Sequence, residues 1–434
     1  MKNRIKAKFK LVDIIILMTI TSTLFYLLSK NLPIGIGSFR FVWGPFSLIT
    51  ILLIKPKVIL KQPVLQLLLI SSILIFLLFF FWDKLFLNHR NQIIEEFYNI
   101  LIFSVIWMYY LTSKNNRNLP KICKFGFIFI IYTIIVTNVV LFIDPMIVRG
   151  SANGFDGNTY QLKLSDTFGV LGYGYAQAIV IFIPILVYHI KKNRNLIFTK
   201  KWLWTILILI IVTTLRAQVF ANVLIMIVTL LMSFAGSKRK KATFRYASLL
   251  ILFVVVIPSS FYINLLNTAS QYFSEDSNTY YKLNDFAMFL ENPELDTTTG
   301  AGGRAERYPI LLEAFLENPI FGDASYTSNL HIELGAHVYW MYRLSVWGIF
   351  GFMFFLSMLY KVYKSIVNSI YDKEMKFYYF LSVLAFIMFG LIKNIAGREP
   401  WIFLIIIIPG LYLGTLEDIR QFELRLGDND NVQK

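Results

Sequence analysis

The stretch HVYWMYRLSVWGIFG, residues 337–351, decides how this chain is understood. It begins with His337 at the end of a long polar segment and runs directly into an apolar helix that starts at about Tyr339. Arg343 lies within it, although the apolar segments of the chain otherwise hold few charges. Polar chemistry beside a membrane span is therefore expected first in the surrounding region, residues 302–351.

Apolar runs of spanning length recur from one end of the chain to the other. Of its 434 residues, 56% are hydrophobic and only 16% are charged, too few charges for a soluble protein of this size. The fold class predicted is an all-α polytopic membrane protein that forms a single integral-membrane domain over residues 1–434. We expect about twelve spans, at residues 11–28, 38–54, 64–82, 97–112, 122–143, 168–190, 202–215, 217–235, 247–263, 338–360, 378–394 and 400–416.

The net charge of +16 reflects membrane orientation rather than nucleic-acid binding. The basic residues fall in alternate short connections, and no basic stripe is interleaved with exposed aromatics. These basic clusters are Lys2–Lys10, Lys55–Lys61, Lys114–Lys124, Lys191–Lys201, Lys238–Arg245 and Lys361–Lys376. With the clusters inside, we expect both termini to be cytoplasmic and the run 11–28 to be an uncleaved signal anchor.

One large external loop, residues 264–336, separates the ninth and tenth expected spans. A loop of this length is commonly functional. Inside it we predict helices at Ser274–Leu290 and Glu306–Glu317, and turns at Asp296–Gly300 and Asn318–Gly322. A second external connection, Asp144–Thr167, is rich in Gly, Asn and Asp and is expected to be a polar loop, and residues 427–434 are expected to form a disordered tail.

Arg216 is the only charged residue between Trp202 and Phe234, and both flanks of that segment are strongly basic. One long span cannot have both ends inside, so we predict two short spans that meet at Arg216 on the outer side. An arginine in this position commonly marks a substrate path. The alternative is a snorkelling arginine that caps the preceding helix.

Arg304 follows Gly302-Gly303 and stands just before a predicted helix. Backbone N–H groups and the helix N-terminus favour an anion there, and the planar guanidinium suits a phosphate. Arg307, one turn later, either joins Arg304 or pairs with Glu306 or Glu313 on the helix surface. The alternative for the whole segment is a solvated helix start.

His337 stands where the large loop enters a span, and a histidine there can accept a proton from a hydroxyl at neutral pH. It can equally be a helix-capping residue. His331 and Glu333 are possible accessory residues, but two histidines six positions apart do not share a helix face, so no metal site is predicted. The single cysteine, Cys123, excludes an intramolecular disulfide and a cysteine-based metal site.

Arg343, Lys393 and Arg398 are further basic residues near the outer ends of the last spans. If these spans pack together, the three residues add positive charge to the same outer face as Arg304. Interfacial anchoring is the alternative explanation for Lys393 and Arg398.

Four motifs in this order resemble the O-antigen ligase and polymerase family of bacterial integral-membrane glycosyltransferases. The motifs are Thr213-Thr214-Leu215-Arg216, Gly303-Arg304, the Asn-Pro-x-x-Gly turn Asn318–Gly322, and His337 followed by Gly348-Ile349-Phe350-Gly351. They cover residues 200–360, and the rest of the chain is similar in topology alone. Two departures stand out: Val338 follows the histidine where family members usually have Asn, Ser or Gln, and Leu215 and Ala217-Gln218 flank Arg216.

The resemblance implies a lipid-carrier-dependent (type C) fold and a glycan donor on an undecaprenyl diphosphate carrier. Arg216 and Arg304, joined by Arg307 and Arg343, would hold the diphosphate, and His337 would be the base. The reaction would take place at the outer face of the bacterial cytoplasmic membrane, without a cofactor or a metal. It would either polymerise repeat units of an O-antigen, capsule or exopolysaccharide or pass a glycan to a non-carrier acceptor. A flippase and a chain-length regulator are the implied protein partners.

A glycan-lipid transporter is the alternative from a different functional class. Transporters are commonly built from repeated halves with binding groups near the membrane midplane. The sequence has no such symmetry, and its polar groups gather on one expected outer face. The position of Arg216 distinguishes the transporter from the glycosyltransferase. A transporter would place Arg216 in a central cavity, whereas the enzyme would place it at the outer surface.

Overall fold

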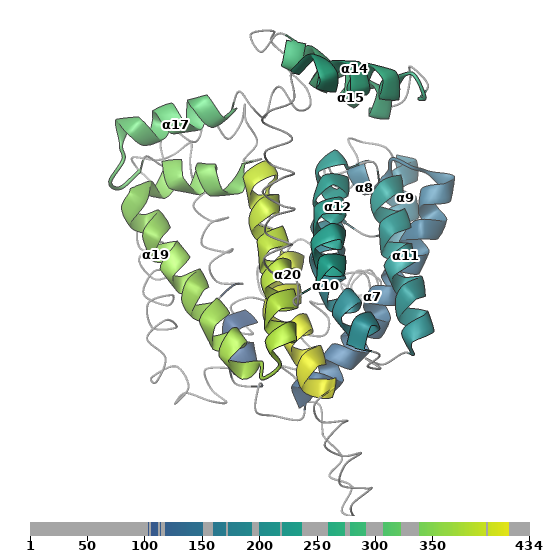
Figure 1. Ribbon diagram of the computed structural model, residues 1–434, viewed down its shortest axis with the longest axis vertical. Coiled ribbons are helices and arrows are strands. Elements are labelled where there is room, and N and C mark those ends of the chain that lie inside the picture. The colour runs from purple at the N-terminus through teal and green to yellow at the C-terminus, as the bar shows by residue number, and fades with distance from the viewer. Residues whose placement is uncertain are drawn as a thin grey trace, which may run out of the picture. The chain divides into compact units, whose positions relative to one another are not determined.

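The computed structural model describes residues 118–150, 159–192, 199–236, 259–273, 278–291, 307–322, 338–395 and 398–415, apart from positions 171 and 218, together with parts of 103–113. The chain divides into two compact units. The first unit contains Met1–Ala217, Met358–Val383 and Ala396–Lys434, and the second contains Gln218–Ser357 and Leu384–Ile395. Every regular element in the described ranges is a helix (Figure 1), which confirms the all-α class.

Four of the described helices are long and apolar enough to cross a membrane. They are α7 (Asn118–Ile143), α10 (Tyr173–Lys192), α19 (Tyr339–Ser369) and α20 (Lys373–Ile392). Shorter helices occupy three more of the expected spans: α11 (Lys200–Arg216), α12 (Phe220–Ala235), and α21 (Arg398–Ile402), which continues through the π-helix η3 (Phe403–Ile407) to Thr415. The expected spans 11–28, 38–54 and 64–82, and parts of 97–112 and 247–263, lie outside the described residues.

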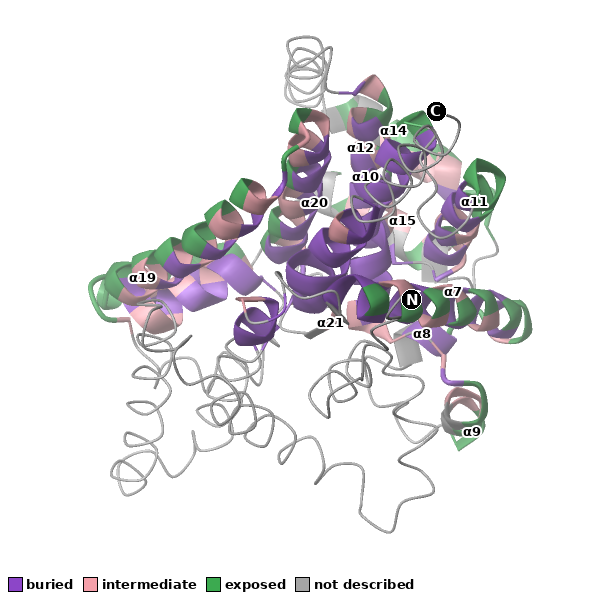
Figure 2. Cartoon of the chain, turned by 90° about the horizontal axis from the view of Figure 1, so that it is seen from below, coloured by how far each residue is buried: buried purple, intermediate pink, exposed green. Residues whose placement is uncertain are grey.

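α7 carries a continuous stripe of exposed apolar side chains along one side. They recur every three or four residues: Phe125, Ile128, Tyr132, Ile135, Val139 and Phe142. This is the spacing of one helix face, and in water such a stripe would be unfavourable. Figure 2 shows the opposite arrangement for α10, where all side chains from Tyr175 to Ile190 are buried. The exposed stripe and the long apolar helices indicate insertion into a membrane.

Both helices predicted within residues 264–336 are present. α15 (Asn278–Glu291) and α17 (Arg307–Glu317) fall where helical periodicity was expected, and residues 318–322 form the expected turn. α14 (Ser259–Ser270) runs past residue 263, the predicted end of the ninth span, and packs against α15 (Figure 1). At the polar end of α14, the hydroxyls of Thr268 and Ser270 donate hydrogen bonds back to the carbonyls of Asn264 and Asn267.

The connection 144–167, expected to be a polar loop, contains helices instead. α8 (Ile147–Gly150) and α9 (Thr159–Phe168) lie within it or at its end. Both oxygens of Asp144 accept hydrogen bonds, one from the Met146 N–H and the other from the Gln161 side chain, each at 2.8 Å. The carboxylate thereby ties α9 to the end of α7, which composition alone does not reveal.

The core of the first unit is built around η3. A π-helix disturbs the regular i to i−4 ladder, so its carbonyls need other donors. The Cys123 thiol donates to the Ile406 carbonyl at 3.3 Å, and the Tyr379 hydroxyl donates to the Leu404 carbonyl at 3.2 Å. Gly410 lies against Cys123, where a Cβ would approach the sulfur well within 3.0 Å. Cys123 therefore has a structural role in the packing of α7 on the last helix.

Asp372 joins three elements of the first unit at the connection between α19 and α20. Its carboxylate accepts hydrogen bonds from the Tyr188 hydroxyl at 2.6 Å and from the Glu374 N–H at 2.8 Å. The Tyr412 hydroxyl accepts from the backbone N–H groups of Tyr371 and Asp372, both at 3.1 Å. The ends of α10 and of the last helix are thus fixed to the start of α20.

Removing the charge of Asp372 should make stability less dependent on pH. Burial opposes its ionisation, but the Tyr188 hydrogen bond, two backbone N–H groups and Lys192 together hold its pKa below the ordinary value. A depressed pKa gives stability that is complete above the unfolded-state value of about 3.9 and is lost as pH falls through the folded-state value. We expect Asp372→Asn to be less stable than the wild type at pH 7 by on the order of 1 kcal/mol.

Thermal unfolding of both proteins in detergent between pH 7 and pH 3 tests this expectation. The difference in unfolding temperature should shrink as the pH drops below about 4. A difference that stays constant over the whole range would show that the carboxylate charge is not the stabilising feature.

Candidate functional site

α19 is broken at Gly348, which has φ 60° and ψ −177° in the middle of the helix. The span predicted at residues 338–360 therefore contains a break that the sequence did not indicate. The first segment, Tyr339–Trp347, turns sharply into the second segment, Ile349–Ser369, close to α17 (Figure 1). At 1.5 Å per residue the second segment alone measures roughly 30 Å, which is enough to cross a bilayer. Only glycine adopts this backbone conformation at low cost, which explains the position of the break.

The turn at residues 318–322 is seated in this break. The Ile349 N–H donates to the Pro319 carbonyl at 2.8 Å, and the Phe350 N–H donates to the Ile320 carbonyl at 3.1 Å. These are amides at the start of a helical segment, which have no partner inside the helix. The turn thus acts as a backbone cap for the second segment of α19.

Two glycines make this close approach possible. A Cβ on Gly322, which has φ 73°, would meet the Val346 carbonyl at well under 3.0 Å. A Cβ on Gly348 would meet the Ile320 carbonyl and the Gly322 nitrogen equally closely. We call this arrangement of the 318–322 turn and Gly348 the glycine joint. Two motifs that are separate in the sequence therefore form one structural unit.

The first segment of α19 packs against α17. Val338 and Tyr342 form a small apolar cluster with Leu311 and Ala314. The Ser345 hydroxyl donates to the Leu311 carbonyl at 2.6 Å. Together with the glycine joint, these contacts hold the first segment of α19 alongside α17.

The same segment is also fixed to the end of α20. The Trp340 indole N–H donates to the Ile387 carbonyl at 2.8 Å, and the indole occupies the space where a Cβ on Gly390 would lie. From α17, the Tyr308 hydroxyl donates to the Leu391 carbonyl. Partial burial raises the pKa of Tyr308 above its ordinary value, so the hydroxyl remains a neutral donor. Three elements of the second unit therefore meet at one junction, and Tyr308 and Trp340 were not singled out from the sequence.

Arg343 is held inside this junction by aromatic rings. Only 3% of its surface is exposed, and its guanidinium carbon lies 4.3 Å from the centre of the Tyr339 ring and 4.4 Å from that of Trp347, with Phe355 at 5.5 Å. Cation–π attraction over several rings stabilises a charge that burial would otherwise disfavour. The guanidinium is consequently fixed in orientation.

Replacing Arg343 by lysine should lower stability although the charge is kept. A lysine ammonium is compact and strongly hydrated and cannot stack its plane on the rings. We expect a loss of about 1–2 kcal/mol, read as a lower unfolding temperature in detergent. Arg343→Met, which keeps the apolar stem without the charge, separates lost packing from the lost cation–π contact. Equal stability of Arg343→Lys and the wild type would contradict the aromatic stabilisation.

Two more basic residues lie on, or directly after, the helices that form this junction. Arg307 is the first residue of α17, and its Nε and Nη1 atoms are buried. Lys393 directly follows α20 and is only 6% exposed. Basic groups of the second unit are therefore shielded from bulk solvent. Because they are shielded, their interactions with an anion would be less screened than in water.

Arg216 belongs to the first unit, where it ends α11. Its Nη2 donates to the Leu141 carbonyl at 3.3 Å, and its guanidinium carbon lies 3.5 Å from the centre of the Phe142 ring. Arg216 thus caps the end of α7 rather than its own helix. The helix breaks after Arg216 and α12 begins at Phe220, so a helix break is present at the position where two short spans were predicted to meet.

One turn before Arg216, a buried polar contact links α11 to α7. Asn138 of α7 donates to the Thr213 hydroxyl at 2.5 Å and to the Leu209 carbonyl at 3.3 Å. α7 and α11 therefore end side by side, and the Thr213–Arg216 motif is packed against α7. The partners come from a helix far earlier in the sequence, so no local pattern indicates them.

The remaining predicted site residues have no described side chain. Arg304, His331, Glu333 and His337 lie outside the described residues, and Arg398 opens α21 with a side chain that is not described. Among the residues that are described, no group of three His, Cys, Asp or Glu side chains is arranged to hold a metal ion. Arg307, Arg343 and Lys393 all belong to the second unit, while Arg216 belongs to the first.

Comparison of the chain with models of known protein families and with curated proteins found no match.

Proposed function

We propose that this protein is a glycosyltransferase that polymerises lipid-linked oligosaccharide repeat units at the outer face of the cytoplasmic membrane. The donor is a glycan on an undecaprenyl diphosphate carrier, and the acceptor is a hydroxyl of the next carrier-linked repeat. The observation that carries the proposal is the glycine joint. Two of the four motifs that resemble the O-antigen ligase and polymerase family meet in it through backbone hydrogen bonds.

The surroundings of the joint support the same proposal. Arg307 and Arg343 belong to helices that pack on each other next to it, through Leu311, Val338 and Tyr342. A lipid diphosphate leaving group carries negative charge, which oriented cations stabilise as it departs. Residue 337 immediately precedes Val338, so the candidate base is attached to the segment that carries Arg343.

The proposed reaction uses His337 to take the proton from the acceptor hydroxyl. The acceptor oxygen then forms a bond to the anomeric carbon of the donor glycan while the bond from that carbon to the diphosphate oxygen breaks. The diphosphate leaves with its negative charge toward Arg304 and Arg216, with Arg307 and Arg343 adding to the positive potential. No cofactor is needed in this scheme.

The experiment that tests the function is the size distribution of surface glycan from a strain that lacks this protein. Loss of the ladder of repeats, with surface glycan of a single repeat unit remaining, supports the polymerase. Full-length glycan that accumulates on its lipid carrier would instead indicate transfer to a non-carrier acceptor. Repeat units trapped on the cytoplasmic side would indicate a transporter and overturn the proposal. Restoration by the wild type and by Gly172→Ala, whose added Cβ meets nothing within 4 Å, controls for expression.

A further inference from the structure

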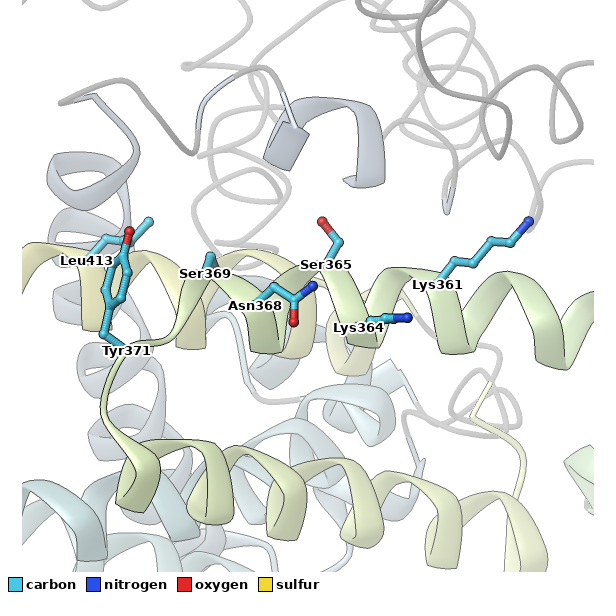
Figure 3. A pocket seen from close by; sticks show the side chains of 7 residues that line it. All are labelled: Lys361, Lys364, Ser365, Asn368, Ser369, Tyr371 and Leu413. Carbon is cyan, nitrogen blue, oxygen red and sulfur yellow. The ribbon is translucent and has the colours of Figure 1, made fainter.

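A second polar site lies in the first unit, in a hollow of about 550 Å³ at the end of α19. Its described lining consists of Lys361, Lys364, Ser365, Asn368, Ser369, Tyr371 and Leu413. Figure 3 shows the two lysines at one end, Tyr371 and Leu413 at the other, and the serine and asparagine side chains between them. None of these residues belongs to the proposed glycosyltransferase site.

The composition of the lining selects an anion. Residues 361, 364, 365 and 368 follow helical spacing and therefore share one side of the last turns of α19. They offer two ammonium groups, an amide N–H₂ and a hydroxyl as donors, and no residue in the described lining is acidic. Ser369 forms the inner wall, where its hydroxyl is hydrogen-bonded with Tyr110 at 2.8 Å and donates to the Ile366 carbonyl at 2.6 Å.

The other end of the hollow is apolar and exposed. Tyr371 is 81% exposed and lies in the connection between two helices that are long and apolar enough to span a membrane, a position typical of interfacial aromatic residues. Next to it stands Leu413 of the last helix. The lysines and the apolar end thus match a phosphate group joined to an apolar body.

We propose that this hollow binds a phosphate group, presented by an anionic lipid headgroup or by a soluble phosphate. The two lysines hold the phosphate oxygens, and Asn368 and Ser365 complete their hydrogen bonds. By the distribution of basic residues in the sequence, the segment Lys361–Lys376 faces the cytoplasm, so the site serves the inner leaflet or the cytoplasmic solution. This proposal does not depend on the glycosyltransferase activity.

The test measures binding of two probes to purified full-length protein in nonionic detergent. Phosphatidylglycerol binding is followed by native mass spectrometry, and inorganic phosphate binding by calorimetry against sodium chloride of equal ionic strength. The variant is Lys361→Gln/Lys364→Gln, and the control is Lys373→Gln/Lys376→Gln, which removes the same charge from neighbouring residues outside the hollow. Both changes affect partly or fully exposed side chains, and equal unfolding temperatures confirm that the fold is intact.

We expect the first variant to weaken binding on the order of tenfold to thirtyfold and the control to leave it within about twofold, because each lysine near an anionic headgroup contributes a few-fold or more. Loss of lipid binding alone identifies the headgroup as the ligand, and loss of phosphate binding alone identifies a soluble phosphate. Equal effects of the two double variants, or no binding of either probe by the wild type, would overturn the proposal.

Discussion

Replacement of Gly348 by alanine should abolish the glycine joint and with it both folding yield and glycan transfer. The residue has φ 60° and ψ −177°, a region that is almost exclusive to glycine and costs other residues roughly 1–3 kcal/mol. The added Cβ would also press on backbone atoms of Ile320 and Gly322, which cannot rotate away. We therefore expect a loss of more than about 3 kcal/mol, measured as a large drop in unfolding temperature.

Gly322→Ala provides the partner experiment. Its Cβ would meet the Val346 carbonyl, so it should disrupt the same joint from the other side. Two changes that break one contact are not additive, and the double variant should be little worse than either single variant. Gly172→Ala, where the new Cβ meets nothing within 4 Å, should behave like the wild type. Additive losses for Gly322 and Gly348 would show that the two glycines act independently.

The sequence predicts the positions of the apolar helices α10 and α11 closely because apolar run length is a local property. The bounds of α10 and α11 fall within five residues or fewer of the expected spans 168–190 and 202–215. The break in α19 was missed because Gly348 stands in an apolar run that also fits a straight span. The Asn-Pro-x-x-Gly turn was recognised, but its contact with α19 was not. That contact is made by backbone carbonyls and N–H groups, which nearly every residue type has, so the sequence does not indicate it.

The candidate site shows the same division between local and non-local information. Arg216 was predicted at a helix break, and the break is present, but its partner on α7 could not be inferred. Arg343 was interpreted as outer-face charge, whereas three aromatic rings surround it. Two of those rings come from its own helix at spacings of four residues, Tyr339 and Trp347. A stripe of aromatics at i−4 and i+4 around an arginine is a signal that sequence inspection can use.

The variant His337→Ala should stop glycan transfer without reducing stability. A positioned general base contributes about 10²–10⁴-fold to the rate, so the repeat ladder should disappear in the complemented strain. The wild-type rate should fall at pH values low enough to protonate an imidazole, and this fall should be missing from the residual activity of the variant. The measurement is transfer by purified protein in vesicles with a lipid-linked repeat, over a range of pH.

The neighbouring residue supplies the control that separates chemistry from structure. Val338 is 1% exposed and packs with Leu311, Ala314 and Tyr342. Val338→Ala should therefore reduce the free energy of unfolding by roughly 1–2 kcal/mol, which is measured as a lower unfolding temperature. His337→Ala should instead have the unfolding temperature of the wild type but a much lower rate of glycan transfer. If His337→Ala retains the ladder, His337 is not the base. If both variants fail only through instability, the segment before α19 has a structural role, and the base must be sought among other residues.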